Sequence, residues 1–303
     1  MQTIKYNNLT WIDINNPNQK DIEYLKENFN FHHFILDELL KPTMRPKVEK
    51  YDRYIFMVLH FPIFIQRIKR TFAREIDLLI TPDAVITIHY ESIEPLQEFL
   101  DKCVMKGEIR EKTMSKSAGH LIYYIIENLF DFSFRELDHI QQKIDKIESK
   151  MFKNAERKII EDISIVRRDI ANFIRTIKPQ KTILNSLMAR GPEFFGKEMK
   201  PYFTDMIGDY TRVVNELENH KEIIEALHDT NESLLTTRTN EIIKVLTLFA
   251  VIVFPLTLIA AIFGMNTKIL PIVGRPNDFW IVMGIMIMAT IGMFGYFKYK
   301  KWV

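Results

Sequence analysis

One helical stripe near the carboxyl end of the chain combines polar residues with an otherwise apolar segment. Its members recur at alternating steps of three and four residues, the spacing of a seam between helices: Asn240, Ile243, Thr247, Ala250, Phe254, Thr257 and Ala261. In a symmetric oligomer this seam would surround an axis, and Asn240 and Thr257 would then line a polar path. The alternative is that Thr257 donates to its own backbone carbonyl one turn earlier, a common role for threonine in membrane helices. The spacing alone leaves both interpretations open.

Other residue patterns that carry chemistry are missing from the sequence. His32 and His33 stand outside an HExxH pattern, and the chain holds neither a phosphate-binding loop nor a nucleophile elbow. We therefore expect neither an enzyme nor an organic cofactor. The formal net charge of +2 comes without a basic stripe interleaved with aromatics, so nucleic acid is not an expected partner. Cys103 is the only cysteine, which excludes an internal disulfide and fits a reducing cytosol.

Two charge-free runs of 19 residues each, 245–263 and 279–297, place the stripe in a lipid bilayer. Each run is just long enough to cross a hydrocarbon core about 30 Å thick as a helix. The alternative, a pair of buried core helices, is disfavoured because the two runs stand in tandem after a charged chain. Lysines flank the runs on the sides away from their connecting loop: Lys244, Lys298, Lys300 and Lys301. Because basic flanks prefer the cytoplasm, both termini are expected inside and the loop 264–278 outside.

The first 115 residues mix strand and helix signals and predict an α/β domain. Their amino-terminal end lacks the apolar core of a signal peptide, so this domain is expected to be cytoplasmic. A strand is predicted at 11–14, followed by a helix from near Asn16-Pro17 with Asn16 as its cap. Runs rich in β-branched and aromatic residues predict three further strands, at 54–60, 76–80 and 84–89.

Long helices are predicted for residues 116–244, which precede a membrane part at 245–303. Apolar residues at helical spacing predict helices at 116–153 and 155–190, with a break from Gly191-Pro192 through Gly196. From Glu198 to Phe263 no strong stop signal precedes Pro255. Those 66 residues are therefore expected to form one helix about 100 Å long, which would carry a cytoplasmic event to a membrane gate.

Several short motifs, in order, resemble the CorA family of magnesium and cobalt transporters. The first span ends in Gly264-Met265-Asn266, a tripeptide that is uninformative alone but specific at the outer end of the first of two C-terminal spans. The other matching segments are WIDI from Trp11, RPKVE from Arg45, YIFMVLHFP from Tyr54, PYFTD from Pro201, TNEIIKV from Thr239 and the basic ending KYKKWV from Lys298. The resemblance covers nearly the whole chain.

This resemblance implies a homopentamer in the cell membrane, with a funnel-shaped cytoplasmic part, the first span lining a pore and the second forming an outer ring. The residues that it places along the pore are Asn240, Ile243, Leu246, Ala250, Phe254 and Thr257, with Gly264, Met265 and Asn266 as the selectivity filter. Leu246 differs by one position from Thr247 of the stripe. A ring of Asn266 amide oxygens would accept hydrogen bonds from the waters of Mg²⁺, which dehydrates reluctantly. Leu246 and Phe254 would form apolar constrictions that gate the pore.

The resemblance also implies regulation by the transported ion. Glu38 matches an acidic residue that faces Asp205 of the neighbouring subunit, with Asp37 and Asp209 as further candidate ligands. A bound Mg²⁺ would favour the closed state. Without the resemblance, these four carboxylates would be interpreted as solvated surface groups.

One departure from the family pattern leaves the transported ion open. After Asn266 the loop carries Lys268 and Arg275 against Asp278, where the family often has an acidic residue soon after the tripeptide, so Co²⁺ and Ni²⁺ stand beside Mg²⁺. The zinc-transporting branch usually has isoleucine at the position of Met265, which favours magnesium. A zinc-type transporter is one alternative, and a membrane-anchored helical scaffold or sensor that conducts no ions is another. Ion flux in proteoliposomes separates a transporter from a scaffold.

Overall fold

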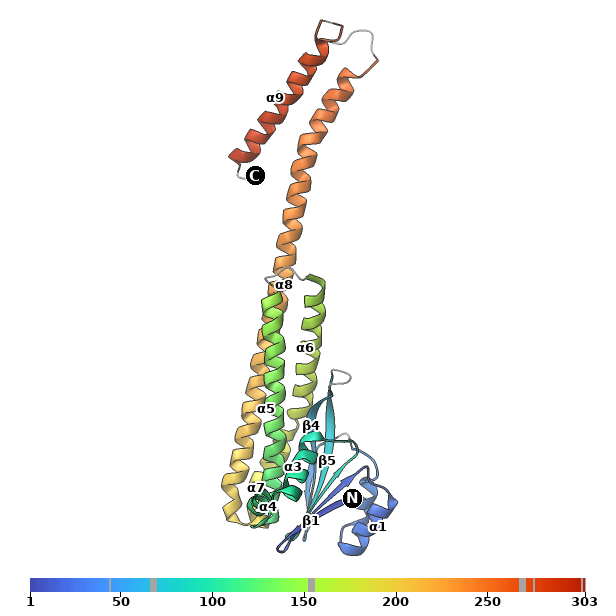
Figure 1. The fold of residues 1–303 in the computed structure, drawn as a ribbon, viewed down its shortest axis with the longest axis vertical. Helices are drawn as coiled ribbons and strands as arrows, with labels where there is room; N and C mark the ends of the chain where they lie inside the picture. The colour runs from blue at the N-terminus through green and yellow to red at the C-terminus, as the bar shows by residue number, and fades with distance from the viewer. Residues whose placement is uncertain are drawn as a thin grey trace. The chain divides into compact units, whose positions relative to one another are not determined.

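A six-stranded mixed sheet lies in the amino-terminal part of the chain (Figure 1). The computed structural model describes residues 1–43, 45–65, 70–151, 156–266, 271–274, 276–300 and 302. The strands are β1 (Gln2–Tyr6), β2 (Leu9–Asn15), β3 (Lys47–Lys50), β4 (Ile55–Ile65), β5 (Arg70–Ile80) and β6 (Ala84–His89). Their order is β1-β2-β6-β5-β4-β3, in which β2 and β6 are parallel and the other neighbours antiparallel. The α/β prediction for this region is confirmed, and β1 and β3 add strands that the sequence did not reveal.

Alternate residues of the central strands form the core against two short helices, α1 (Gln19–Asn28) and α2 (His33–Glu38). Successive side chains of a strand point to opposite faces, so one set of alternate positions meets the helices. The buried members from the sheet are Ile12, Ile14, Phe56, Val58, Leu79, Ala84, Ile86 and Ile88, and those from the helices and their flanks are Ile22, Leu25, Phe31, Ile35, Leu36 and Leu39.

A buried polar network fixes the register of the parallel pair. Asp13 of β2 lies opposite Thr87 of β6, and the Thr87 hydroxyl donates to Asp13 Oδ1 at 2.5 Å. Trp11 Nε1 donates to Thr87 Oγ1 at 3.1 Å, and His89 Nε2 lies 3.2 Å from Asp13 Oδ2. Each buried polar group in this network therefore has a partner, as stable burial requires.

The prediction that Asn16 caps the first helix is wrong by two residues. Asn16 has a φ of +54°, and α1 begins at Gln19 with Asn18 as its cap. Asn18 Oδ1 accepts from the amides of Lys20 and Asp21, and Asp21 Oδ2 accepts from the Asn18 amide. This reciprocal arrangement satisfies several amide donors of the first turn, which Asn16 lies too early to reach.

Helices make up most of the remaining chain. They are α3 (Glu94–Met105), α4 (Gly107–Met114), α5 (Ala118–Met151), α6 (Glu156–Ile177), α7 (Gln180–Phe195), a single 3-10 turn η1 (Lys197–Met199), α8 (Lys200–Phe263) and α9 (Asp278–Tyr299). In Figure 1, α5 and α6 run alongside each other, with the amino-terminal part of α8 beside α5.

Two predicted helix boundaries are wrong. The segment expected as one helix at 155–190 divides at Lys178-Pro179, because proline supplies no amide hydrogen to continue the ladder. The expected break at Gly191-Pro192 is instead part of α7, which ends at Phe195 and is capped by Gly196 with a φ of +107°. Gly191 serves close packing: a Cβ added there would lie 2.4 Å from Phe203 Cε2.

The chain forms two compact units, Met1–His228 and Asp229–Val303. Helix α8 is continuous through Pro255, as predicted, and ends at Phe263. The divisions expected after residues 115 and 244 remain predictions.

Candidate cation pathway and regulatory carboxylates

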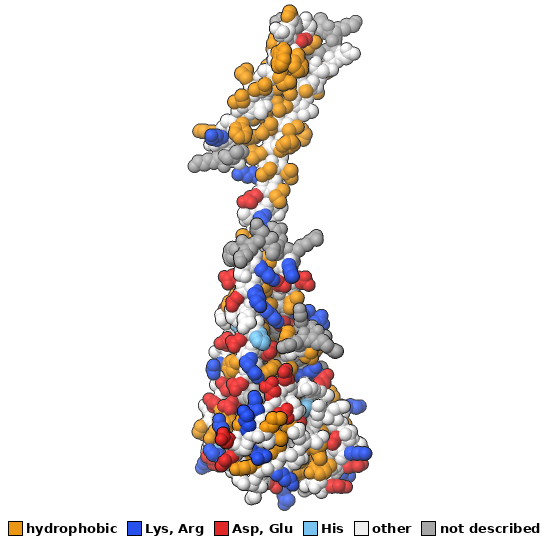
Figure 2. All heavy atoms as spheres, in the orientation of Figure 1, with side chains coloured by type: hydrophobic (Ala, Val, Ile, Leu, Met, Phe, Trp, Pro, Cys, Tyr) orange, Lys and Arg blue, Asp and Glu red, His pale blue; other side chains and the backbone are white. Residues whose placement is uncertain are grey.

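Many apolar side chains are exposed on the carboxyl-terminal part of α8 and on α9, and a number of them are seen on the face drawn in Figure 2. Apolar windows in the helical segments Lys197–Phe263 and Asp278–Tyr299 have mean hydropathies of 2.7 and 1.8, and none of the residues in these windows is buried. Side chains of this kind leave water when an apolar environment is available. By length and composition both helices are candidate membrane spans.

The residues expected along the pore share one stripe of α8. At about 100° per residue, the six positions and Thr247 fall within an arc of about 120°. Leu246 lies at one margin of the arc and Thr247 near the other. Leu246 is 62% exposed and Phe254 72% exposed, so neither side chain is covered by its own chain. Both Leu246 and Thr247 lie within this arc, so the rotation of α8 about its axis in an assembly would decide which of them faces the pore.

Backbone chemistry near the middle of the first span adds a polar feature. Thr257 Oγ1 donates to Val253 O at 2.9 Å, which is the local interaction expected as the alternative to a pore role. The hydroxyl oxygen keeps its capacity to accept a hydrogen bond. Pro255 has no amide hydrogen, so the carbonyl of Val251 loses its usual helical donor. Sequence reasoning missed this carbonyl, although the proline signals it.

The filter tripeptide follows directly on the end of α8. The Gly264 amide donates to Ala260 O at 2.9 Å, and the Met265 amide donates to Ile262 O at 3.3 Å. A Cβ on Gly264 would lie 3.1 Å from Ala260 O, tighter than most real contacts. Met265 and Asn266 are exposed. Lys268 and Arg275 of the following loop lie outside the described residues, whereas Asp278 accepts from the amides of Gly274 and Phe279.

Asp205 lies in an acidic junction between α5 and α8. The Tyr123 hydroxyl is 2.7 Å from Asp205 Oδ2 and 2.8 Å from Glu127 Oε1. A hydroxyl holds one proton, so it can donate to only one of these two carboxylates at a time. The hydroxyl therefore satisfies one carboxylate at a time, and the two acids compete for it. Burial and these two carboxylates raise the pKa of Tyr123.

Asp209 continues the junction one turn along α8. Burial raises the pKa of its carboxyl, and the charge of Asp205 raises it further, with Asp131 and Glu127 contributing, while Arg212 at 3.4 Å opposes them. Sequence reasoning missed Glu127 and Asp131. Their signal was available: Tyr123, Glu127 and Asp131 repeat at steps of four and therefore share one face of α5.

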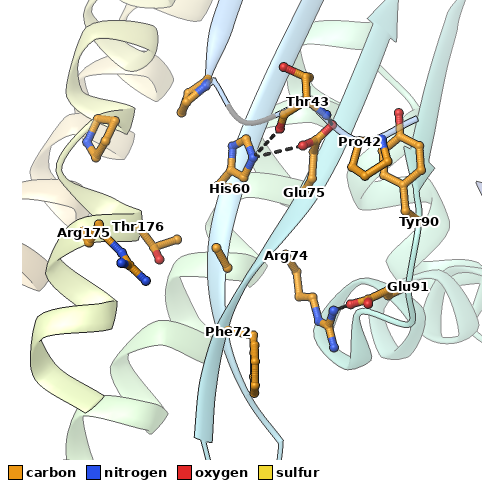
Figure 3. Close-up of a pocket in the computed structure, with 13 residues that line it drawn as sticks. Pro42, Thr43, His60, Phe72, Arg74, Glu75, Tyr90, Glu91, Arg175 and Thr176 are labelled. Atoms are coloured by element: carbon orange, nitrogen blue, oxygen red, sulfur yellow. Dashed lines mark hydrogen bonds and ion pairs between the residues drawn. The ribbon is translucent and has the colours of Figure 1, made fainter. Parts of the chain in front are cut away.

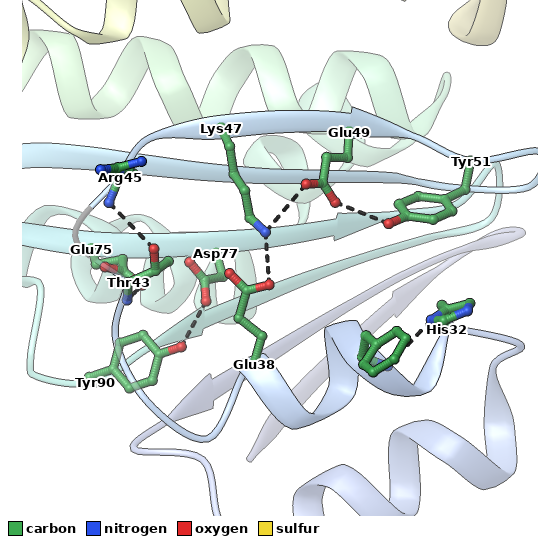
Figure 4. A network of polar contacts seen from close by, with 11 residues as sticks. His32, Glu38, Thr43, Arg45, Lys47, Glu49, Tyr51, Glu75, Asp77 and Tyr90 are labelled. Carbon is green, nitrogen blue, oxygen red and sulfur yellow. Dashed lines mark hydrogen bonds and ion pairs between the residues drawn. The ribbon is translucent and has the colours of Figure 1, made fainter.

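Glu38 lies in the same compact unit as Asp205 but has different neighbours (Figure 4). Its carboxylate forms an ion pair with Lys47 Nζ at 2.7 Å, and Lys47 also lies 3.4 Å from Glu49. The pKa of Lys47 is raised by its hydrogen bond and charge contact with Glu38, against the effect of partial burial. Asp37, beside Glu38 on α2, is exposed. Within one chain Glu38 therefore pairs with a cation, whereas Asp205 and Asp209 lie among other acids, although Arg212 also contacts Asp209.

Buried acids lie behind this ion pair. Asp77 is fully buried, and burial raises the pKa of its carboxyl well above the ordinary value, with further increases from the charges of Glu75 and Glu38. The Tyr90 hydroxyl donates to Asp77 Oδ2 at 2.8 Å. Glu75 is held by His60 Nε2 at 3.0 Å and by the Thr43 amide at 2.7 Å, beside a cavity of about 700 Å³ (Figure 3). Asp77 Oδ1 is buried without a hydrogen-bond partner among the described residues, whereas both oxygens of Glu75 are bonded.

A ready-made metal centre is absent from the part of the chain that the structure describes. Groups of three or more His, Cys, Asp or Glu side chains that could hold an ion do not occur among those residues. The carboxylates that the sequence singled out are thus divided between two places, and one chain does not bring them together.

Comparison with known proteins connects this geometry to a family. Residues 6–300 match the profile of CorA-like Mg²⁺ transporter proteins. The cobalt/magnesium transport protein CorA of Thermotoga maritima is 30% identical over 298 residues, covering 97% of this chain and 83% of that protein. The structure of the CorA magnesium transporter from Methanocaldococcus jannaschii superposes with a TM-score of 0.86 at 22% identity, covering 100% of this chain and 95% of that one.

A second solved structure shares the fold. The full-length CmaX protein superposes with a TM-score of 0.77 at 17% identity, covering 97% of this chain and 89% of that one. The resemblance seen in the order of the sequence motifs is thereby confirmed. The chain belongs to the family of CorA-like Mg²⁺ transporter proteins.

Proposed function

We propose that this protein moves Mg²⁺ across the cell membrane through a pore built from five copies of the chain, with Co²⁺ and Ni²⁺ as further candidate ions. The observation that carries the proposal is the family match over residues 6–300, ending in two exposed apolar helices with Gly264-Met265-Asn266 after the first. In the proposed assembly the carboxyl-terminal part of α8 lines the pore and α9 surrounds it. Lys244 and Lys298 flank the spans and favour cytoplasmic termini.

Asn266 is proposed as the filter residue. Mg²⁺ holds its waters tightly, so a bare carboxylate ring would have to compete with them. Five amide oxygens instead accept hydrogen bonds from the coordinated waters and hold the hydrated ion weakly. The tight end of α8 at Gly264 supports this role, because it limits how the following residues leave the helix.

Leu246 and Phe254 are proposed as apolar constrictions. Both are exposed on the stripe and neither offers a ligand to a hydrated ion, so close approach of five helices would exclude water and stop the ion. Entry is driven by the membrane potential, which contributes about 2.3 kcal/mol per charge per 100 mV, or about 4.6 kcal/mol for a divalent ion.

Glu38 and Asp205 are proposed to share a regulatory cation between neighbouring subunits, with Asp37 and Asp209 as further ligands. Carboxylate oxygens suit a hard dication. A cation at Glu38 would have to compete with the Lys47 ammonium, and a cation at Asp205 would have to compete with the hydrogen bond from the Tyr123 hydroxyl. Binding would relieve the repulsion in the acidic junction and favour the closed state.

The test of the transport proposal is Mg²⁺ flux in proteoliposomes. Asn266→Ala should lose nearly all uptake while the oligomer still assembles, because a methyl group accepts no hydrogen bond. Asn8→Ala, which removes an exposed amide from the β1–β2 turn, is the matched control and should conduct normally. Uptake by Asn266→Ala at the control rate would overturn the filter assignment. Zn²⁺ in place of Mg²⁺ tests the zinc-type alternative, and a wild-type protein without flux of any divalent ion would indicate a scaffold.

A further inference from the structure

A basic groove lies between the long helices and the β4–β5 hairpin, away from the carboxylates described above. It has a volume of about 690 Å³ and is lined by α5, α6, the end of β4 and the start of β5. We call it the basic groove and define it by its basic side chains: Arg70, Lys143, Lys146, Lys150 and Arg168.

Only part of this positive charge is neutralised. Lys143 pairs with the fully buried Asp169 at 3.2 Å, and Lys150 pairs with Asp162 at 2.8 Å. The remaining cations, Arg70, Lys146 and Arg168, have no ion-pair partner among the residues that the structure describes.

A count of charges shows how concentrated this excess is. The five cations face three acids, Glu161, Asp162 and Asp169, which leaves a formal charge of +5 − 3 = +2. The whole chain of 303 residues carries the same net charge of +2. A cleft lined by one sign of charge focuses its field on the ligand that enters it.

Part of the groove's lining is apolar. Ile147 and Val166 line it and are buried, and Phe64 also lines it. The Lys143 ammonium lies 4.5 Å from the centroid of the Phe64 ring, a cation–π contact that helps to hold this cation in place. The groove therefore combines cations with apolar surface, a common composition for small-ligand sites.

The types of the unpaired cations specify the anion. Arg70 and Arg168 come from β5 and α6, and each guanidinium presents a planar fork of donors that matches two oxygens of a phosphate. Lys146 adds a point charge from α5. An isolated carboxylate needs one such partner, whereas a group with several phosphate oxygens can engage all three.

We infer that the basic groove binds a phosphate-bearing anion in the cytoplasmic unit, at a site separate from the transported ion and from the regulatory carboxylates. Two sources share this chemistry: a soluble polyphosphate and the headgroup of an anionic phospholipid. The inference concerns binding alone and stands independently of the pore assignment.

Binding is measured on the full chain in zwitterionic detergent by isothermal titration. One arm uses inorganic tripolyphosphate as the sodium salt without divalent metal, and the other uses short-chain phosphatidylglycerol against short-chain phosphatidylcholine. We expect saturable binding in at least one arm, weakened by rising NaCl because exposed charges are screened. Tripolyphosphate binding identifies a soluble ligand, and binding of phosphatidylglycerol alone identifies a lipid headgroup.

The groove variant is the triple substitution Arg70→Gln, Lys146→Gln and Arg168→Gln, and it should weaken binding about tenfold or more, since it removes three charge-assisted contacts. The control triple Lys5→Gln, Lys20→Gln and Lys26→Gln changes the net charge equally at exposed positions outside the groove and should bind as wild type. If the triple variant of the groove loses the circular dichroism signal of its helices, the single substitution Lys146→Glu is tested in its place. Equal loss in both triples, unchanged binding in the groove variants, or binding of neither probe to wild type would overturn the inference.

Discussion

Replacing Gly191 with alanine tests how closely α7 packs against the start of α8. A Cβ on Gly191 would lie 2.4 Å from Phe203 Cε2 and 3.0 Å from Phe203 Cζ. Carbon atoms normally approach to about 3.5–4.0 Å, so either the ring or a helix must move. Phe203 is 1% exposed, so its ring cannot turn into solvent to make room for the added methyl group.

The expected change in the free energy of unfolding follows from two opposing effects. Overpacking of a core costs about 1–3 kcal/mol. Alanine regains about 1 kcal/mol of helix propensity over glycine, since Gly191 lies inside α7. The severity of the overlap places the cost at the upper end, so the free energy of unfolding should fall by about 1–2 kcal/mol. At roughly 2–4 °C per kcal/mol, Tm should fall by several degrees.

Gly208→Ala is the matched control for this change. Gly208 is exposed within α8, and an added Cβ would have no heavy atom within 4 Å. Only the propensity gain applies, so the free energy of unfolding should rise by up to about 1 kcal/mol. Both variants are compared with wild type by thermal unfolding of the full chain in detergent, with circular dichroism as the signal. A Gly191→Ala protein as stable as Gly208→Ala would refute the packing argument.

Three further changes test the titration, gate and regulation assignments. Because the pKa of Asp77 is raised in the folded protein, the folded state binds this proton more tightly and loses stability as pH rises above the ordinary value of 3.8. Asp77→Asn should therefore flatten the decline of Tm as the pH rises above this value, and a wild-type slope would contradict this. Leu246→Ser or Phe254→Ser should hydrate the constriction and raise Mg²⁺ leak in proteoliposomes; unchanged leak in both would place the gate elsewhere. If Mg²⁺ binds between subunits as proposed, it should protect residues 1–228 of the wild type from protease, and Glu38→Gln with Asp205→Asn should abolish that protection. Identical protection curves for the two proteins would identify these carboxylates as solvated surface.

The sequence by itself determined those features of the protein that depend only on neighbouring residues in the chain. The charge-free runs predicted the exposed apolar parts of α8 and α9, because helix length and side-chain polarity are properties of consecutive residues. The missing stop signals before Pro255 likewise predicted that α8 is one helix to Phe263. The order of short motifs sufficed to indicate the CorA family, since each motif is contiguous in the chain.

Glycine and proline show where local reasoning fails. Gly191-Pro192 has the composition of a helix break but lies within α7. The glycine is needed there because Phe203 of α8 occupies the space that a side chain at position 191 would need. Pro179 produces the real break. The signal of a glycine is ambiguous until its neighbours in space are known, since both a turn and a close helix contact require a small residue.

The partners of charged residues were decided only by the tertiary structure. The family resemblance implied that Glu38 faces Asp205 of a neighbouring subunit, which stays a prediction. Within one chain Glu38 pairs with Lys47, while Asp205 and Glu127 both contact the Tyr123 hydroxyl. The basic groove likewise brings together cations from β5, α5 and α6. The two that lie farthest apart in the sequence, Arg70 and Arg168, are separated by nearly 100 positions. Electrostatic energy depends on distance in space and on burial, and neither is encoded in the spacing of residues along the chain.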